Sequence, residues 1–87
     1  MNVEDKIRYC QFLIDCCHTF NENEKAHLKF FVKNRKEAVL DRAIEFLEKF
    51  TDDLCKDKGN EQSTTYVLRS MELLSILLEK NSGDKAQ

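Results

Sequence analysis

The sequence has no proline, no tryptophan and only two glycines, Gly59 and Gly83. An all-β fold needs many turn residues, so this scarcity indicates a chain built from helices. The glycine-rich loops that hold phosphates in nucleotide-binding folds are excluded as well, because such loops need closely spaced glycines. No apolar run approaches the roughly 20 residues that span a bilayer, and we expect no membrane association.

What the chain does contain is the composition of a compact helical protein. Hydrophobic residues make up 41% and charged residues 34% of its 87 residues, which is too apolar for a disordered chain. A domain of this size has a small core, and a partner or a second copy often supplements it. We expect a single helical domain over residues 1–82 and a disordered tail over residues 83–87.

The cysteine pattern bears on cellular location and on cofactors. Three of the four cysteines crowd the first helical segment, and the N-terminal residues show no apolar signal sequence. We therefore expect reduced thiols in the cytoplasm or the nucleus, although Cys17 and Cys55 could approach each other across an antiparallel helix pair. No cysteine or histidine pair has the spacing that binds a metal from one helical turn, so we expect no metal and no other cofactor.

Catalysis is not expected either. A nucleophilic cysteine needs a neighbouring base, a third group that orients the base, and a pocket around them. A three-helix domain of this length leaves little room for such a pocket, and paired carboxylates such as Asp52 and Asp53 are typical of solvated surface. We predict that this protein is not an enzyme.

Apolar residues at spacings of three and four predict a first helix over residues 3–20. Asn2 can cap its start, and Glu4 and Asp5 place negative charge in the first turn, where the helix dipole favours it. The apolar side covers nearly half of the helix circumference. This helix is therefore expected to pack against two others.

Residues 22–58 form a long central stretch with helical spacing and without proline or glycine. Phe30 points away from its apolar stripe. One continuous helix of some 35 residues would span roughly 50 Å and overhang a compact domain, which favours a dimer. A break near Asn34 would instead allow a compact bundle of four helices. Both alternatives stay open.

A third helix is predicted over residues 62–80, after a boundary at Gly59, which suits the left-handed residue that ends a helix. Leu68, Leu73 and Ile76 lie outside the main apolar seam of this helix. The seam consists of Val67, Met71, Leu74 and Leu78, and its border of Tyr66, Ser70 and Leu77. A helix with apolar residues on several sides is either central to the fold or has a second interface. We assign these three residues to partner binding.

Charge is distributed unevenly along the central stretch. Residues 25–36 contain five basic side chains and no acidic one, although the net charge of the chain is −2. Lys25, Lys29, Lys33 and Lys36 share one face if the helix is continuous. Such a stripe can bind an acidic protein surface, whereas specific nucleic-acid binding also needs groups that read or stack on bases. A solvated face with no partner is the simpler alternative. The residues that we assign to partner binding here are Lys25, Lys29, Phe30, Lys33 and Lys36.

Together these patterns predict an all-α protein: a three-helix antiparallel bundle, or a four-helix one if the chain breaks at Asn34, with a dimer as an open alternative. The predicted function is a small protein–protein interaction module, an adaptor or assembly subunit that binds another protein or a second copy through apolar helix faces. The alternative is a small inhibitor or regulator, of the viral or toxin-neutralising type, that binds an acidic protein surface through its lysines. A nucleic-acid-binding regulator is the least favoured hypothesis.

Overall fold

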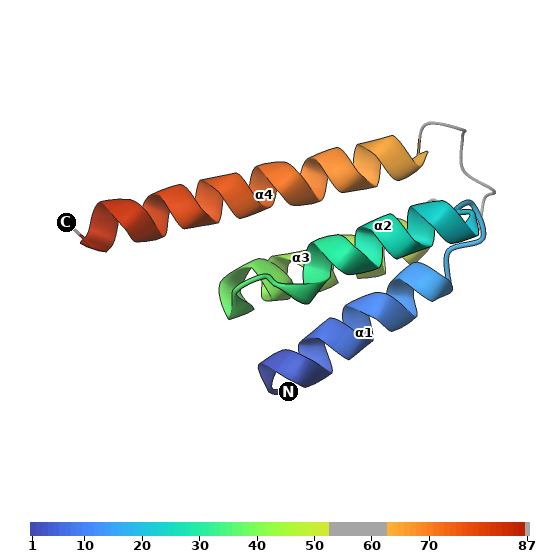
Figure 1. Cartoon of the computed structure of the whole chain (residues 1–87), viewed down its shortest axis with the longest axis horizontal. Coiled ribbons are helices and arrows are strands. Elements are labelled where there is room, and N and C mark those ends of the chain that lie inside the picture. Colours follow the sequence, from blue (N-terminus) through green and yellow to red (C-terminus); the bar gives the residue numbers. More distant parts are fainter. Residues whose placement is uncertain (53–62, 87) are drawn as a thin grey trace.

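The computed structural model describes residues 1–52 and 63–86, and every regular element among them is a helix. Four helices follow one another along the chain (Figure 1). Their bounds are Val3–Asp15 for α1, Glu22–Lys33 for α2, Glu37–Phe50 for α3 and Ser63–Ala86 for α4. The all-helical class predicted from the scarcity of proline and glycine is confirmed.

Helix α1 begins as predicted but ends early. The side chain of Asn2 caps it by accepting a hydrogen bond of 2.8 Å from the backbone N–H of Asp5. The helix ends at Asp15 rather than at residue 20. The chain then turns so that Cys17 and Phe20 are buried in the core, where the rings of Phe20 and Phe50 stack at 5.7 Å. Burial of these two side chains stabilises the turn over a further turn of helix.

A capping box starts helix α2. The side chain of Asn21 accepts a hydrogen bond of 2.8 Å from the N–H of Glu24, and the carboxylate of Glu24 accepts one of 2.8 Å from the N–H of Asn21. Two N–H groups that lack helical partners are thereby satisfied. The asparagine predicted as a cap therefore acts as one, and the direction of the chain reverses between α1 and α2 (Figure 1).

The central stretch breaks at Asn34, which settles the choice between one helix and two. Helix α2 ends at Lys33 and α3 begins at Glu37, with Asn34 in a non-helical conformation at φ −114° and ψ 23°. Arg35 stabilises the end of α2, since its Nε–H donates to the carbonyl of Phe31 at 3.0 Å and its guanidinium lies 4.1 Å from the centre of the Phe31 ring. One continuous helix is excluded.

Folding back at Asn34 lets α2 and α3 bury their apolar faces in one core. Helix α1 packs against both of them. The residues that become fully buried or nearly so come from all three helices: Cys10, Ile14, Leu28, Val32, Leu40 and Leu47. A kinked central stretch thus gives an 87-residue chain the single core that a straight helix would have prevented.

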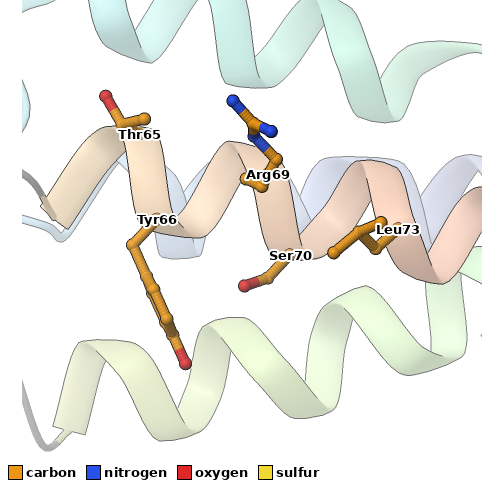
Figure 2. A pocket seen from close by; sticks show the side chains of 5 residues that line it. All are labelled: Thr65, Tyr66, Arg69, Ser70 and Leu73. Carbon is orange, nitrogen blue, oxygen red and sulfur yellow. The ribbon is translucent and has the colours of Figure 1, made fainter.

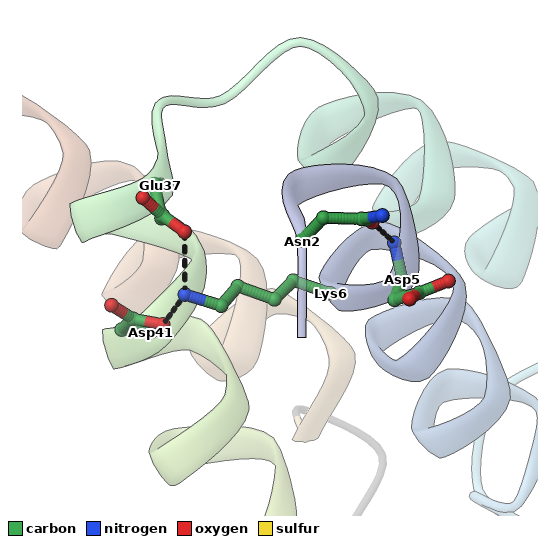
Figure 3. Close-up of polar contacts among 5 residues, drawn as sticks. All are labelled: Asn2, Asp5, Lys6, Glu37 and Asp41. Carbon is green, nitrogen blue, oxygen red and sulfur yellow. Dashed lines mark hydrogen bonds and ion pairs between the residues drawn. The ribbon is translucent and has the colours of Figure 1, made fainter.

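Polar contacts fasten α1 to α3 at the edge of this core. The Nζ of Lys6 lies 2.9 Å from a carboxylate oxygen of Glu37 and 2.7 Å from one of Asp41 (Figure 3). One helical turn further along, the hydroxyl of Tyr9 donates to the carboxylate of Glu48 at 2.5 Å. The hydrogen bond to Asp41, followed by that to Glu37, raises the pKa of Lys6 above its ordinary value of 10.5.

Helix α4 packs on α3 and is the longest helix of the fold. Its C-terminal end extends past the ends of the other helices (Figure 1), and the molecule measures 45 × 24 × 22 Å along its principal axes. The helix runs to Ala86, whereas the sequence predicts an end near residue 80 and a tail over residues 83–87. The predicted boundary at Gly59 and the predicted helical residues 53–58 lie outside the described residues.

Candidate partner-binding surface

The lysines predicted to form one stripe are divided by the break at Asn34. Lys25, Lys29 and Lys33 lie on α2, whereas Lys36 lies beyond the break and precedes the first residue of α3. A shared face requires one continuous helix, so the prediction of a four-lysine face is wrong in this respect.

Two of these lysines also have acidic partners within the chain. The Nζ of Lys29 lies 2.6 Å from a carboxylate oxygen of Asp15 at the end of α1, and that of Lys25 lies 3.9 Å from Glu22. Lys33 and Lys36 are exposed. The basic surface open to a partner is therefore smaller than the sequence suggests.

Phe30 is the most exposed large apolar residue of the described chain, with 72% of its surface accessible. The chain breaks at Asn34, but the break does not turn this side chain toward the core, and Phe30 remains exposed. It stays a candidate contact on α2 next to the lysines.

Helix α4 carries a second, apolar surface. Tyr66, Ile76 and Leu77 are each 58% exposed and Leu73 is 53% exposed. They lie on the side of α4 opposite to Val67 and Met71, which are buried in the core. We call the four exposed residues the apolar α4 face.

The predicted residues of α4 divide between the two sides of this helix. Leu73 and Ile76 lie on the apolar α4 face, as expected for partner-binding residues. Leu68 is partly buried and packs against the core, so it is not available to a partner in the same way. Tyr66 and Leu77 were not among the predicted residues, because the sequence pattern placed them at the border of the buried seam.

An open groove of about 650 Å³ runs along this surface (Figure 2). Tyr66 extends from α4 toward α3, and its ring lies 6.0 Å from that of Phe46. Arg69 points to the opposite side, toward α2, and Leu73 lies at the other end of the groove. An apolar floor with a cationic edge is suited to hold side chains of another helix.

A second groove, of about 300 Å³, lies between the end of α2 and α4. Its lining includes Arg35, which donates to the hydroxyl of the buried Ser75 at 2.9 Å, and also Glu72 and Ile76. This hydrogen bond connects the α2–α3 junction directly to α4. Ile76 therefore belongs both to the lining of this groove and to the apolar α4 face.

Three of the four cysteines, Cys10, Cys16 and Cys17, lie among the described residues. Burial raises the pKa of the Cys10 thiol from 9.0 to about 11, which keeps it protonated and unreactive. Cys10 and Cys16 are free thiols, but Cys17 is disulfide-bonded, which corrects the expectation that all the cysteines are reduced. Among the described residues, no group of histidine, cysteine and carboxylate side chains is placed to hold a metal ion.

The fold and this surface define the protein as an all-helical protein with one exposed apolar helix face. Within residues 1–52 and 63–86, no helix has both the length and the hydropathy needed to cross a membrane. No protein-family model, no curated protein and no solved structure matches the chain.

Proposed function

We propose that this protein is a small protein-binding module, an adaptor or assembly subunit, that docks a partner on the apolar α4 face. The observation that supports this is the exposure of four large apolar side chains on a helix whose other side is buried. Full burial of one such side chain is worth roughly 1.5–3 kcal/mol, so a complementary partner would be bound favourably. Exposed apolar surface gathered on one element is typical of interaction sites.

In this proposal the four helices form an antiparallel bundle with a division of roles. Helices α1, α2 and α3 supply most of the core, and polar contacts join α1 to α3. Helix α4 presents the binding surface. The alternating directions of successive helices in Figure 1 support this arrangement. The role is binding rather than catalysis, consistent with a buried Cys10 thiol whose pKa is about 11.

The cellular location stays a prediction. The free thiols of Cys10 and Cys16 favour the cytoplasm or the nucleus, and the disulfide at Cys17 counts against these reducing compartments. Cells quenched with acid and then treated with an alkylating reagent carry the label only on cysteines that are reduced in the cell. Mass spectrometry of the labelled chain would therefore show whether Cys17 is oxidised in its host.

A second candidate function uses charge. Lys33 lies one helical turn after the exposed Phe30 on α2, Lys36 is exposed beyond the break, and an acidic protein surface could bind there. The ion pairs of Lys25 and Lys29 weaken this candidate because they neutralise half of the predicted stripe. A nucleic-acid partner is weaker still, since the chain has a net charge of −2.

Photo-crosslinking in the host cell tests the principal proposal. A photoreactive benzoylphenylalanine replaces Leu73 in one variant and Arg8 in the control; Arg8 is exposed on α1 with 72% of its side-chain surface accessible. We expect a crosslinked protein adduct from position 73 and none from position 8. Equal adducts at both positions, or none at either, would contradict the proposal.

Salt dependence separates the two candidate functions. Docking on apolar side chains should change little between low and moderate salt, whereas binding through lysines should weaken steeply. The matched variants, both with the photoreactive residue at position 73, are Leu77→Glu for the apolar α4 face and Lys33→Glu with Lys36→Glu for the lysines. Loss of the adduct only in the lysine variant would favour the charge-based function.

A further inference from the structure

Helix α4 is longer than α3, the helix on which it packs. Its 24 residues span about 36 Å, and the 14 residues of α3, on which it packs, span about 21 Å. Figure 1 shows the C-terminal end of α4 beyond the ends of the other helices. The exposed Ile76 and Leu77 directly follow Ser75, which is bonded to Arg35 at the junction between α2 and α3.

A charged pair flanks the centre of the exposed side of α4. Glu72, Ile76 and Lys80 are spaced by four residues, so they form one row along the helix surface. Glu72 is half-buried and Lys80 is exposed. Within residues 1–52 and 63–86, neither of these two charged groups has an ion pair or a hydrogen bond.

We propose that the apolar α4 face binds a second copy of this chain, with the two α4 helices antiparallel about a two-fold axis near Ile76. This inference rests on the proposed function and names its partner. In this arrangement the row of Glu72, Ile76 and Lys80 on one copy faces the same row of the other copy in the opposite direction, so opposite charges meet. Glu72 of each copy lies opposite Lys80 of the other, and the two Ile76 side chains meet between these ion pairs.

The apolar residues beside the row fit the same register. Leu73 lies three residues before the axis and Leu77 one residue after it. In antiparallel helices, Leu73 of one copy is therefore within about 3 Å of Leu77 of the other along the helix axis. In this register the C-terminal half of α4 of each copy lies alongside Tyr66 and Leu73 of the other copy, which are exposed within the described part of their own chain.

Charge selects the antiparallel orientation over the parallel one. In a parallel pair with the same centre, Glu72 would face Glu72 and Lys80 would face Lys80, which places like charges together at both ends. The antiparallel pair replaces both repulsions with attractions. One helix pair is a small interface compared with the roughly 800 Å² per partner of a stable dimer, so we expect micromolar affinity.

Light scattering after size exclusion tests the pairing on the purified full chain. We expect the mass to rise with concentration from 10.3 kDa toward twice that value. Glu72→Lys and Lys80→Glu should each weaken association by about tenfold, because each makes both cross-pairs repulsive. The double variant, and also an equimolar mixture of the two single variants, should restore association.

Ile76→Glu should abolish association, and Phe12→Glu is its matched control. Phe12 is also 58% exposed, but it lies on α1. Circular dichroism confirms that each variant keeps its helix content. Three results would overturn the pairing. The wild-type chain could stay monomeric at several hundred micromolar, or the double variant could fail to restore association. The third is that Phe12→Glu weakens association as much as Ile76→Glu does.

The crosslink at position 73 separates this inference from the proposed function. An adduct with twice the mass of the chain supports the second copy as partner. An adduct with a different protein, together with a monomer in light scattering, overturns the second copy and leaves the binding module standing. Absence of any adduct overturns both.

Discussion

Helices α1–α3 and helix α4 bury their apolar residues to different degrees. Every buried apolar residue of the described chain lies before Thr51, apart from Val67 and Met71. In α1–α3 the buried residues come from facing sides of three helices. In α4 one side is buried and the apolar α4 face remains exposed, although both regions are helical and rich in leucine.

The polar contacts differ in the same way. Helices α1 and α3 are joined by the two ion pairs of Lys6 and by the hydrogen bond between Tyr9 and Glu48. Helix α4 is joined to the α2–α3 junction by the hydrogen bond between Arg35 and Ser75. Helices α1–α3 therefore supply most of the buried contacts of the fold, and α4 is the helix with an exposed apolar side.

The largest effect is expected from a cavity in the three-helix core. Leu40→Ala removes a side chain that is 0% exposed and should lower the free energy of unfolding by about 3 kcal/mol. Leu73→Ala is the matched control on the apolar α4 face and should cost less than about 0.5 kcal/mol. Urea unfolding at low chain concentration measures both, and equal losses would contradict the division between the two regions.

A smaller effect is expected where the two regions are joined. Arg35→Lys keeps the charge but removes the contact with the Phe31 ring and the planar donors that reach the Phe31 carbonyl and Ser75. We expect a loss of about 1–2 kcal/mol and faster hydrogen exchange in α4 than in α1. Arg42→Lys, which alters an exposed ion pair with Glu45, is the control and should change neither measurement.

The capping box of α2 should contribute less to the free energy of unfolding than the contacts of Arg35 do. Asn21→Ala removes the side chain that accepts from the N–H of Glu24 and should cost about 1 kcal/mol in urea unfolding. Asn23→Ala is the control, because Asn23 is an exposed residue of the same first turn that does not cap the helix. If both variants lost the same stability, the cap would have no special role.

The last prediction concerns pH and the fastening of α1 to α3. Asp41 and Glu37 raise the pKa of Lys6 above 10.5, so the folded chain holds this proton more tightly than the unfolded chain. The resulting stabilisation is complete below pH 10.5 and is lost as the pH rises through the folded pKa. The difference in free energy of unfolding between wild type and Lys6→Met should therefore become smaller above pH 10.5. A difference that stays constant with pH would contradict a contribution of the Lys6 proton to stability.

Much of the local structure could be predicted from the sequence. Asn2 and Asn21 cap the helices that follow them, because a cap depends on residues only three positions apart. The exposure of Leu73 and Ile76 could also be anticipated, since both lie off the main seam of α4. Leu68 lies off that seam as well, yet it packs against the core, and no periodic pattern could separate it from the other two.

The helical class, the caps and the amphipathic faces could be predicted because they follow from interactions between near neighbours along the chain. The break at Asn34, the pairing of Lys29 with Asp15 and the outward side of α4 depend on how the helices pack. Residues 33–36 contain no proline or glycine that would mark the break, and the burial of α2 and α3 against α1 is the interaction that favours it. That burial depends on contacts between distant parts of the chain, which local spacing does not encode.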